Sequence, residues 1–146
     1  IATIIAIVGT LSRPDSPSAQ AVAPDFEAVL PENASIDDLG GWQKLTPPSG
    51  DEYYVYTDTL DGVLITVSQQ PLPSTFADNR ETKMAELAQA YNATSTLDAN
   101  GTKVYLGTSA EGPQSVLLSK NSLLILIKSQ SKIQDSAWIS YANSLQ

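Results

Sequence analysis

The chain has 146 residues, 16 acidic against 8 basic side chains, a formal net charge of −8, and neither cysteine nor histidine. This length fits a single domain that can bury a hydrophobic core without disulfides or a structural metal. The two absent residue types exclude disulfides, a thiolate nucleophile, a Ser-His-Asp triad and metal ligation by sulfur or imidazole. The eight cations are scattered, so the acidity predicts solubility and argues against a nucleic-acid partner. We predict that the protein is not an enzyme and carries no cofactor.

The first eleven residues are almost wholly apolar. They are too few to span a membrane as a helix, which needs about 20 residues, but they suit a secretion signal or part of a membrane anchor. Two alternatives are a buried element of the domain and a donor strand that completes the sheet of another copy. Ala19-Gln20-Ala21 has the small-x-small form of a signal-peptidase site. The residues expected to form the anchor or donor segment are Ile1, Ile4, Ile5, Ile7, Val8 and Leu11.

Residues 12–41 carry four prolines, several Ala and Ser, and little hydrophobic periodicity. This composition is typical of a semi-extended linker. Within it, Ser35–Leu39 predicts one helical turn that Ser35 caps and Gly40 ends. The folded domain is predicted to span residues 42–146.

The domain shows seven β-rich runs and two runs of helical periodicity. Asp61-Gly62 and Asn100-Gly101 predict tight hairpin turns. Two segments have the form of a capping box ahead of a helical apolar stripe, at 78–81 and 131–134. The predicted strands are 42–45, 52–60, 63–69, 94–97, 102–108, 114–119 and 123–129, and the predicted helices are 79–92 and 131–145.

The resulting order is β-β-β-α-β-β-β-β-α. Tight turns inside each run predict antiparallel pairing, which gives an α+β fold with an antiparallel sheet of about six to seven strands and two helices packed on one face. Val63, Ile65 and Val67 alternate and are expected to face the core. Leu123–Ile127 is apolar on both faces, which predicts a central strand that is covered on each side, or on one side with a partner on the other.

Few residues suggest a catalytic, metal-binding or phosphate-binding role. Asp58–Gly62 lacks the alternating acids of a calcium loop, and no glycine-rich phosphate loop is present. Adjacent acids on a strand point to opposite faces, so a hydrolase using carboxylates alone would need two acids converging from elsewhere, about 5–10 Å apart. Sequons at Asn33, Asn92 and Asn100 matter only in a host that glycosylates secreted chains.

Three tyrosines on one predicted strand form the candidate binding surface. Tyr54 and Tyr56 share a face, and Tyr53 lies opposite. One face must belong to the core, and the other, if it is solvated, presents the amphipathic aromatics that binding surfaces use. The alternative is that all three are cross-strand packing residues.

The order of four features resembles small extracytoplasmic domains of membrane-anchored bacterial anti-sigma factors and related uncharacterised lipoproteins. These features are the aromatic strand Tyr53–Tyr56, the strand ending Val67-Ser68-Gln69, the strand Thr102–Leu106, and the strand Leu123–Ile127 with the Trp138 helix. The resemblance covers about residues 42–146 and carries over no functional residue.

We therefore expect a non-enzymatic extracytoplasmic binding or sensory domain, either membrane-tethered or secreted. The alternative is a structural subunit of an extracellular filament or surface assembly, joined through the apolar N-terminal segment. The expected partner is accordingly the membrane, another protein or a second copy of the chain.

Overall fold

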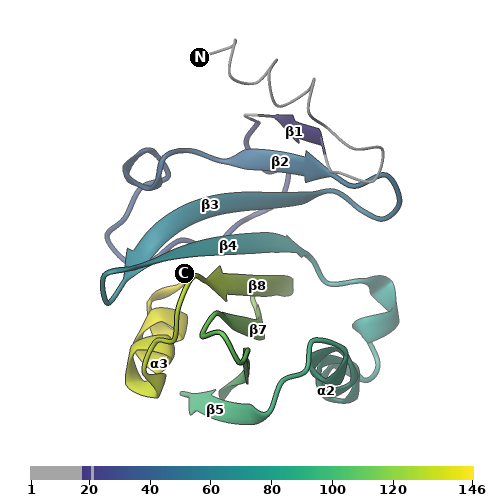
Figure 1. Cartoon of the computed structure of the whole chain (residues 1–146). Helices are drawn as coiled ribbons and strands as arrows, with labels where there is room; N and C mark the ends of the chain where they lie inside the picture. The colour runs from purple at the N-terminus through teal and green to yellow at the C-terminus, as the bar shows by residue number, and fades with distance from the viewer. Residues whose placement is uncertain (1–17, 21) are drawn as a thin grey trace.

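The computed structural model describes residues 18–20 and 22–146. These residues form one antiparallel sheet of eight strands, together with two α-helices and two short 3-10 turns (Figure 1). The strands are β1 (Ser18–Gln20), β2 (Gln43–Thr46), β3 (Tyr53–Leu60), β4 (Val63–Pro71), β5 (Ser95–Ala99), β6 (Thr102–Thr108), β7 (Gln114–Lys120) and β8 (Leu123–Ser129). The helices are α2 (Arg80–Ala90) and α3 (Asp135–Ser144), and the 3-10 turns are η1 (Asp37–Leu39) and η2 (Ser74–Phe76).

The strands lie in the order β1-β2-β3-β4-β8-β7-β6-β5. The connection through α2 carries the chain from β4 to the far edge of the sheet, at β5. Three hairpin connections then bring it back, and β8 pairs with β4 with Val67 opposite Ile127. The predicted α+β class and antiparallel sheet are confirmed, and β8 is the central strand that its apolar faces predicted.

Two tight turns set the register of their hairpins. Asp61 and Gly62 both have positive φ, at 52° and 75°, and Asn100 and Gly101 have φ of 54° and 91°. Positive φ at both central residues defines the primed turn whose twist matches paired strands. Leu60 therefore pairs with Val63, and Ala99 pairs with Thr102, as the sequence predicted.

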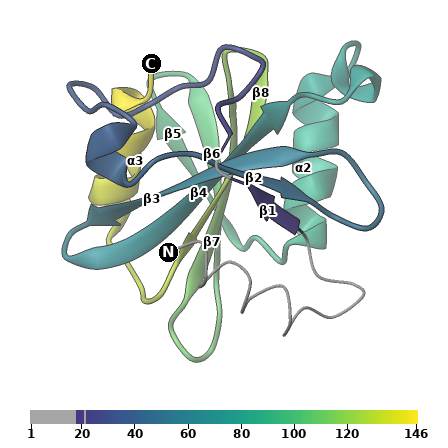
Figure 2. The same ribbon diagram turned by 90° about the horizontal axis from the view of Figure 1, so that it is seen from above.

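The two helices cover opposite faces of the sheet, so the prediction that both lie on one face is wrong (Figure 2). Successive residues of a strand point to opposite faces. Along β6, Val104 and Leu106 belong to the core on the α3 side, whereas Tyr105 packs with Met84 on the α2 side. Strands β6 to β8 carry apolar side chains on both faces, and each face needs a cover of its own.

Neither predicted capping box forms. The N-cap residues of α2 and α3 are Asn79 and Gln134, and neither side chain makes a capping hydrogen bond. Helix α3 starts at Asp135, four residues later than predicted. The backbone N–H of Ile133 donates to the Gln114 Oε1 atom at 2.7 Å instead, which holds the chain outside the helix at that point.

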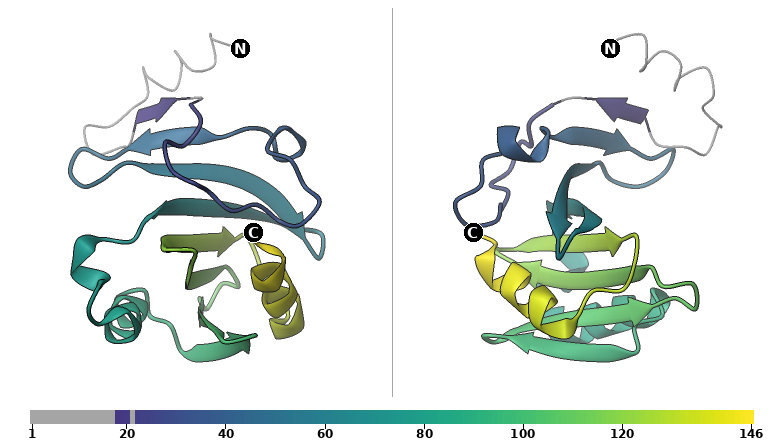
Figure 3. Two further views of the ribbon diagram at one scale, coloured as in Figure 1. Left: turned by 180° about the vertical axis from the view of Figure 1, so that it is seen from behind. Right: turned by 60° about the vertical axis from the view of Figure 1, so that its left-hand side comes forward.

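Residues 22–41, predicted to belong to a linker, pack against the sheet on its α3 face (Figure 3). Val29 is only 1 % exposed, and both of its backbone groups bond to the side chain of Gln69, at 3.0 and 2.7 Å. Leu30 and Gln146 exchange two backbone hydrogen bonds of 3.0 Å. The predicted boundary at residue 42 therefore falls inside the packed unit. The predicted turn at Ser35 is confirmed, since the Ser35 Oγ atom accepts from the Asp38 N–H.

Ile1, Ile4, Ile5, Ile7, Val8 and Leu11, the predicted anchor or donor residues, lie outside the described residues. Ala19 and Gln20 of the predicted signal-peptidase site belong to β1 and pair with Leu45 and Lys44. Within the described part of the chain, neither α-helix is long and apolar enough to cross a membrane.

Candidate functional site

The two faces of the sheet are covered to different extents. On one face, α3 packs on β5 and β6, and residues 22–42 cover the opposite half around Tyr56. On the other face, α2 packs mainly on β6 and β7 through Met84 and Ala88, and Leu124 and Leu126 of β8 lie at the edge of the same cluster. Among the described residues, α2 covers β8 only in part, and the strands beyond it, β4 and β3, have no helix packed on this face. The incomplete cover leaves a hollow on this face of the sheet, and this hollow is the candidate functional site.

This hollow, which we call the sheet groove, has a volume of about 510 Å³. One cross-strand row forms its floor: Val55 of β3 lies opposite Ser68 of β4, Ser68 lies opposite Leu126 of β8, and Leu126 lies opposite Leu117 of β7. Val55 and Leu117 are buried, whereas Ser68 and Leu126 are half-buried. The floor is thus largely apolar and reachable from solvent.

Two walls flank the floor. Leu87 lies in the C-terminal half of α2, and Tyr91, the C-cap residue just after the helix, is 41 % exposed. Pro47 and Gly50 of the loop between β2 and β3 also line the groove. Volumes of about 300–1,000 Å³ with mostly apolar walls are typical of small-molecule sites. The size and lining of the sheet groove both fall in this class.

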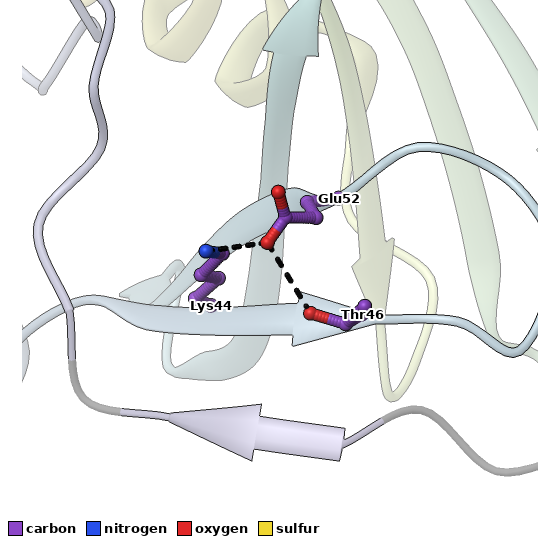
Figure 4. A network of polar contacts seen from close by, with 3 residues as sticks. All are labelled: Lys44, Thr46 and Glu52. Atoms are coloured by element: carbon purple, nitrogen blue, oxygen red, sulfur yellow. Dashed lines mark hydrogen bonds and ion pairs between the residues drawn. The ribbon is translucent and has the colours of Figure 1, made fainter.

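The β2–β3 loop also borders a second cavity of about 340 Å³, which shares Asp51 and Gln70 with the sheet groove. Asp25 and Glu52 line this smaller cavity as well, and we call the junction of the two cavities around Asp51 the acidic end. Figure 4 shows that the Glu52 carboxylate pairs with Lys44 and accepts a hydrogen bond from the Thr46 hydroxyl at 3.5 Å.

This pairing changes the charge available at the acidic end. Glu52 raises the pKa of the Lys44 ammonium because it accepts a hydrogen bond from the charged form. The Lys44 ammonium is thus already ion-paired with Glu52. Asp25 and Asp51 are both exposed and form no ion pair with the described basic residues.

The three predicted tyrosines do not form one surface. Tyr54 is 5 % exposed and packs edge-on against Phe26, with ring centroids 5.4 Å apart. Tyr56 is 1 % exposed and packs edge-on against Trp42 at the same separation. Only Tyr53, which is half-buried, lines the sheet groove. Tyr54 and Tyr56 are therefore packing residues, as the alternative interpretation of the three tyrosines predicted.

The main groove residues were not singled out from the sequence. Leu87 and Tyr91 appeared there only as part of a helical core stripe. Leu124 and Leu126 gave the one usable signal, because a strand that is apolar on both faces requires a cover on each side or a partner on one. The structure shows that α2 supplies that cover only in part.

Outside the cavity that Asp25, Asp51 and Glu52 line, the acids of the sequence pairs have separate hydrogen-bond partners. The Asp61 carboxylate accepts from the Gln134 side chain, whereas Asp58 accepts from the Tyr141 hydroxyl. Asp38 accepts from the backbone N–H of Ser35. Across the described residues, no three Asp or Glu side chains gather as metal ligands would.

The chain matched no protein-family model, no curated protein and no solved structure in the comparisons. The resemblance to extracytoplasmic anti-sigma-factor domains stays a prediction. Any function must therefore be argued from the site itself.

Proposed function

We propose that the protein is a non-enzymatic binding domain that works outside the cytoplasm and takes its ligand in the sheet groove. The observation that carries this proposal is the unequal cover of the two sheet faces. The α3 face is closed by α3 and residues 22–42, whereas the α2 face leaves the apolar groove floor around Leu126 accessible. Concave, mostly apolar sites with a few polar groups are the usual form of ligand pockets.

The proposed location rests on the sequence. The apolar residues 1–11 suit a secretion signal or a tether, and the exterior is rich in Ser and Thr and low in charge, with 16 % charged residues against a usual quarter. A membrane-tethered or secreted domain fits both properties. The test is protease accessibility in intact cells, with the full chain compared with a variant that lacks residues 1–11. Protection of both forms from external protease would overturn the location.

Binding in the groove is tested with a neutral apolar probe, 4-phenyl-1-butanol, titrated into the ¹⁵N-labelled full chain. We expect backbone amide shifts that cluster on Tyr53, Leu87 and Leu126. The Tyr53→Ser variant removes a groove side chain and should weaken these shifts. Leu64→Ser is the matched control, because Leu64 is 43 % exposed on the same sheet face but does not line the groove. Shifts scattered over the surface, or unaffected by Tyr53→Ser, would contradict the proposal.

A further inference from the structure

The acidic end of the sheet groove has negative charge without a matching cation. Asp51 lines both cavities, and Asp25 lines the smaller one. Lys44, the cation beside them, is paired with Glu52. A ligand that places a positive group at this end would meet two exposed carboxylates that form no ion pair with a described basic side chain.

Two aromatic rings line the smaller cavity, on the opposite face of β3 from the groove floor at Val55. Phe26 and Tyr54 both line the smaller cavity and pack edge to face. Aromatic faces attract ammonium groups, and the attraction adds to that of nearby carboxylates. Tyr54 is nearly buried, so the half-buried Phe26 ring is the one that a ligand can reach, and together with the two carboxylates it favours an organic cation over a hydrated metal ion.

The opposite end of the groove carries the opposite charge. Lys128 lines the groove there, and it lies opposite Thr66 in the β4–β8 pairing. Gln70, which lines the acidic end, lies four residues further along β4. At about 3.3 Å per residue, the two ends are roughly 13 Å apart along the strand. A bound cation is thus directed to one end, and an apolar body can extend from it over the floor.

We propose that the sheet groove binds a small organic amine with an apolar body, its ammonium between Asp25 and Asp51 and its body over Val55 and Leu126. This inference rests on the proposed function and names the ligand class of the same groove. A volume of about 510 Å³ suits a small molecule. Walls on two sides, from α2 and from the β2–β3 loop, enclose such a body more closely than an open sheet edge would.

The experiment compares three probes that share one body: 4-phenylbutylamine, 4-phenylbutyrate and 4-phenyl-1-butanol. Each is titrated into the ¹⁵N-labelled full chain at pH 7 and low salt, and dissociation constants are taken from the amide shifts. We expect the amine to bind about tenfold more tightly than the carboxylate, which is the size of one partly shielded ion pair. Raising the salt to 0.5 M should reduce this preference, because exposed charges are screened.

Two variants locate the preference. Asp51→Asn should reduce the amine-to-carboxylate ratio severalfold without loss of folding, since Asp51 is exposed and makes no hydrogen bond to another described residue. Asp78→Asn is the matched control, because it makes the same charge change at an exposed acid outside both cavities. This control should leave the ratio unchanged.

The outcomes separate the two proposals. Equal binding of all three probes in the groove would overturn the amine inference and leave the binding function standing. Absence of groove shifts with every probe would overturn both. A ratio that Asp78→Asn lowers as much as Asp51→Asn would show attraction by the net charge of −8 alone and would overturn the assigned position. Tighter binding of the acetylated peptide amide Lys-Phe-Leu than of the amine would assign the groove to a peptide instead.

Discussion

The hydroxyl of Tyr56 lies 2.9 Å from the hydroxyl of Tyr141, and Tyr141 donates its own proton to Asp58 Oδ2 at 3.0 Å. Tyr56 is therefore the donor to Tyr141. The chain of hydrogen bonds joins β3 to α3 inside the core, where Tyr56 is 1 % and Tyr141 is 6 % exposed. Buried hydroxyls need partners, and here each tyrosine finds one through the other element.

The first prediction concerns the loss of this link. Tyr141→Phe removes the acceptor of the Tyr56 hydroxyl and leaves that hydroxyl buried without a partner. We expect the free energy of unfolding to fall by about 1–3 kcal/mol. Urea denaturation measures it, with Tyr105→Phe as the control, because Tyr105 is buried but has no hydroxyl hydrogen bond to another described residue. Equal losses in both variants would contradict the assigned role.

The second prediction concerns alkaline pH. Burial raises the pKa of both Tyr56 and Tyr141 above the ordinary value, because the charged form is disfavoured away from water. In the unfolded chain tyrosine loses its proton near pH 10. Above that pH the folded state holds more protons than the unfolded state, so stability that is fully present below pH 10 is lost as the pH rises.

The measurement is urea denaturation of the wild type and of a Tyr56→Phe/Tyr141→Phe double variant at pH 8 and pH 11. The variant starts less stable but should lose less stability between the two pH values, because two of its titrating groups are gone. Lysine titration is common to both proteins and cancels in the comparison. An equal loss in both proteins would show that the tyrosine pair does not carry the pH dependence.

Much of the fold could be read from local signals. Primed turns at Asp61-Gly62 and Asn100-Gly101 fix hairpin register within a few residues of chain, so their strands were predicted with nearly correct bounds. The side of the sheet that each helix covers depends on long-range packing. The clue was present in β6, where Tyr105 alternates with Val104 and Leu106, but turn spacing alone does not show it.

The sheet groove and the packing of residues 22–41 were less predictable for the same reason. Val29 is held by Gln69, forty residues away, and the contact uses a polar side chain that no apolar pattern reveals. The groove exists because α2 covers β8 only in part and does not extend over β4. The number of strands that a predicted helix covers depends on where tertiary packing places the helix. The periodicity of its own sequence does not encode that position.

The third prediction tests how residues 22–41 are held. In Gln69→Leu the backbone N–H and C=O of Val29 stay buried but lose both partners. We expect a loss of about 2–4 kcal/mol in the free energy of unfolding and faster hydrogen exchange of the Val29 amide. Gln70→Leu, at the neighbouring half-buried position on the other face, should change neither by much. Unchanged exchange at Val29 in Gln69→Leu would refute the link.

The fourth prediction is a stabilising substitution. Ser122, in the turn between β7 and β8, has a φ of 63°, in the left-handed region that costs an L-residue roughly 1–2 kcal/mol. Ser122→Gly removes this strain and keeps the carbonyl that accepts from Leu72 N–H at 3.0 Å. Glycine also loses more chain entropy on folding, so we expect a net gain of about 0.5–1 kcal/mol, seen as a higher melting temperature. Ser95→Gly, in strand β5, should lower the melting temperature, and a decrease in both variants would argue against turn strain.

The last prediction links the close packing of α2 to the sheet groove. A Cβ atom on Gly107 of β6 would lie 2.9 Å from the backbone oxygen of Asn92, just past the end of α2. Gly107→Ala must therefore push the end of α2 away from the sheet. Because backbone on both sides gives way poorly, we expect a loss of about 1–3 kcal/mol in stability.

The same displacement should move Leu87 and Tyr91, which form one wall of the groove. In folded Gly107→Ala, 4-phenyl-1-butanol should bind several times more weakly than in the wild type, and the amide shifts of Leu87 should differ before any probe is added. Wild-type affinity in a destabilised Gly107→Ala protein would show that the groove does not depend on the α2 wall, and the floor residues alone would then define the site.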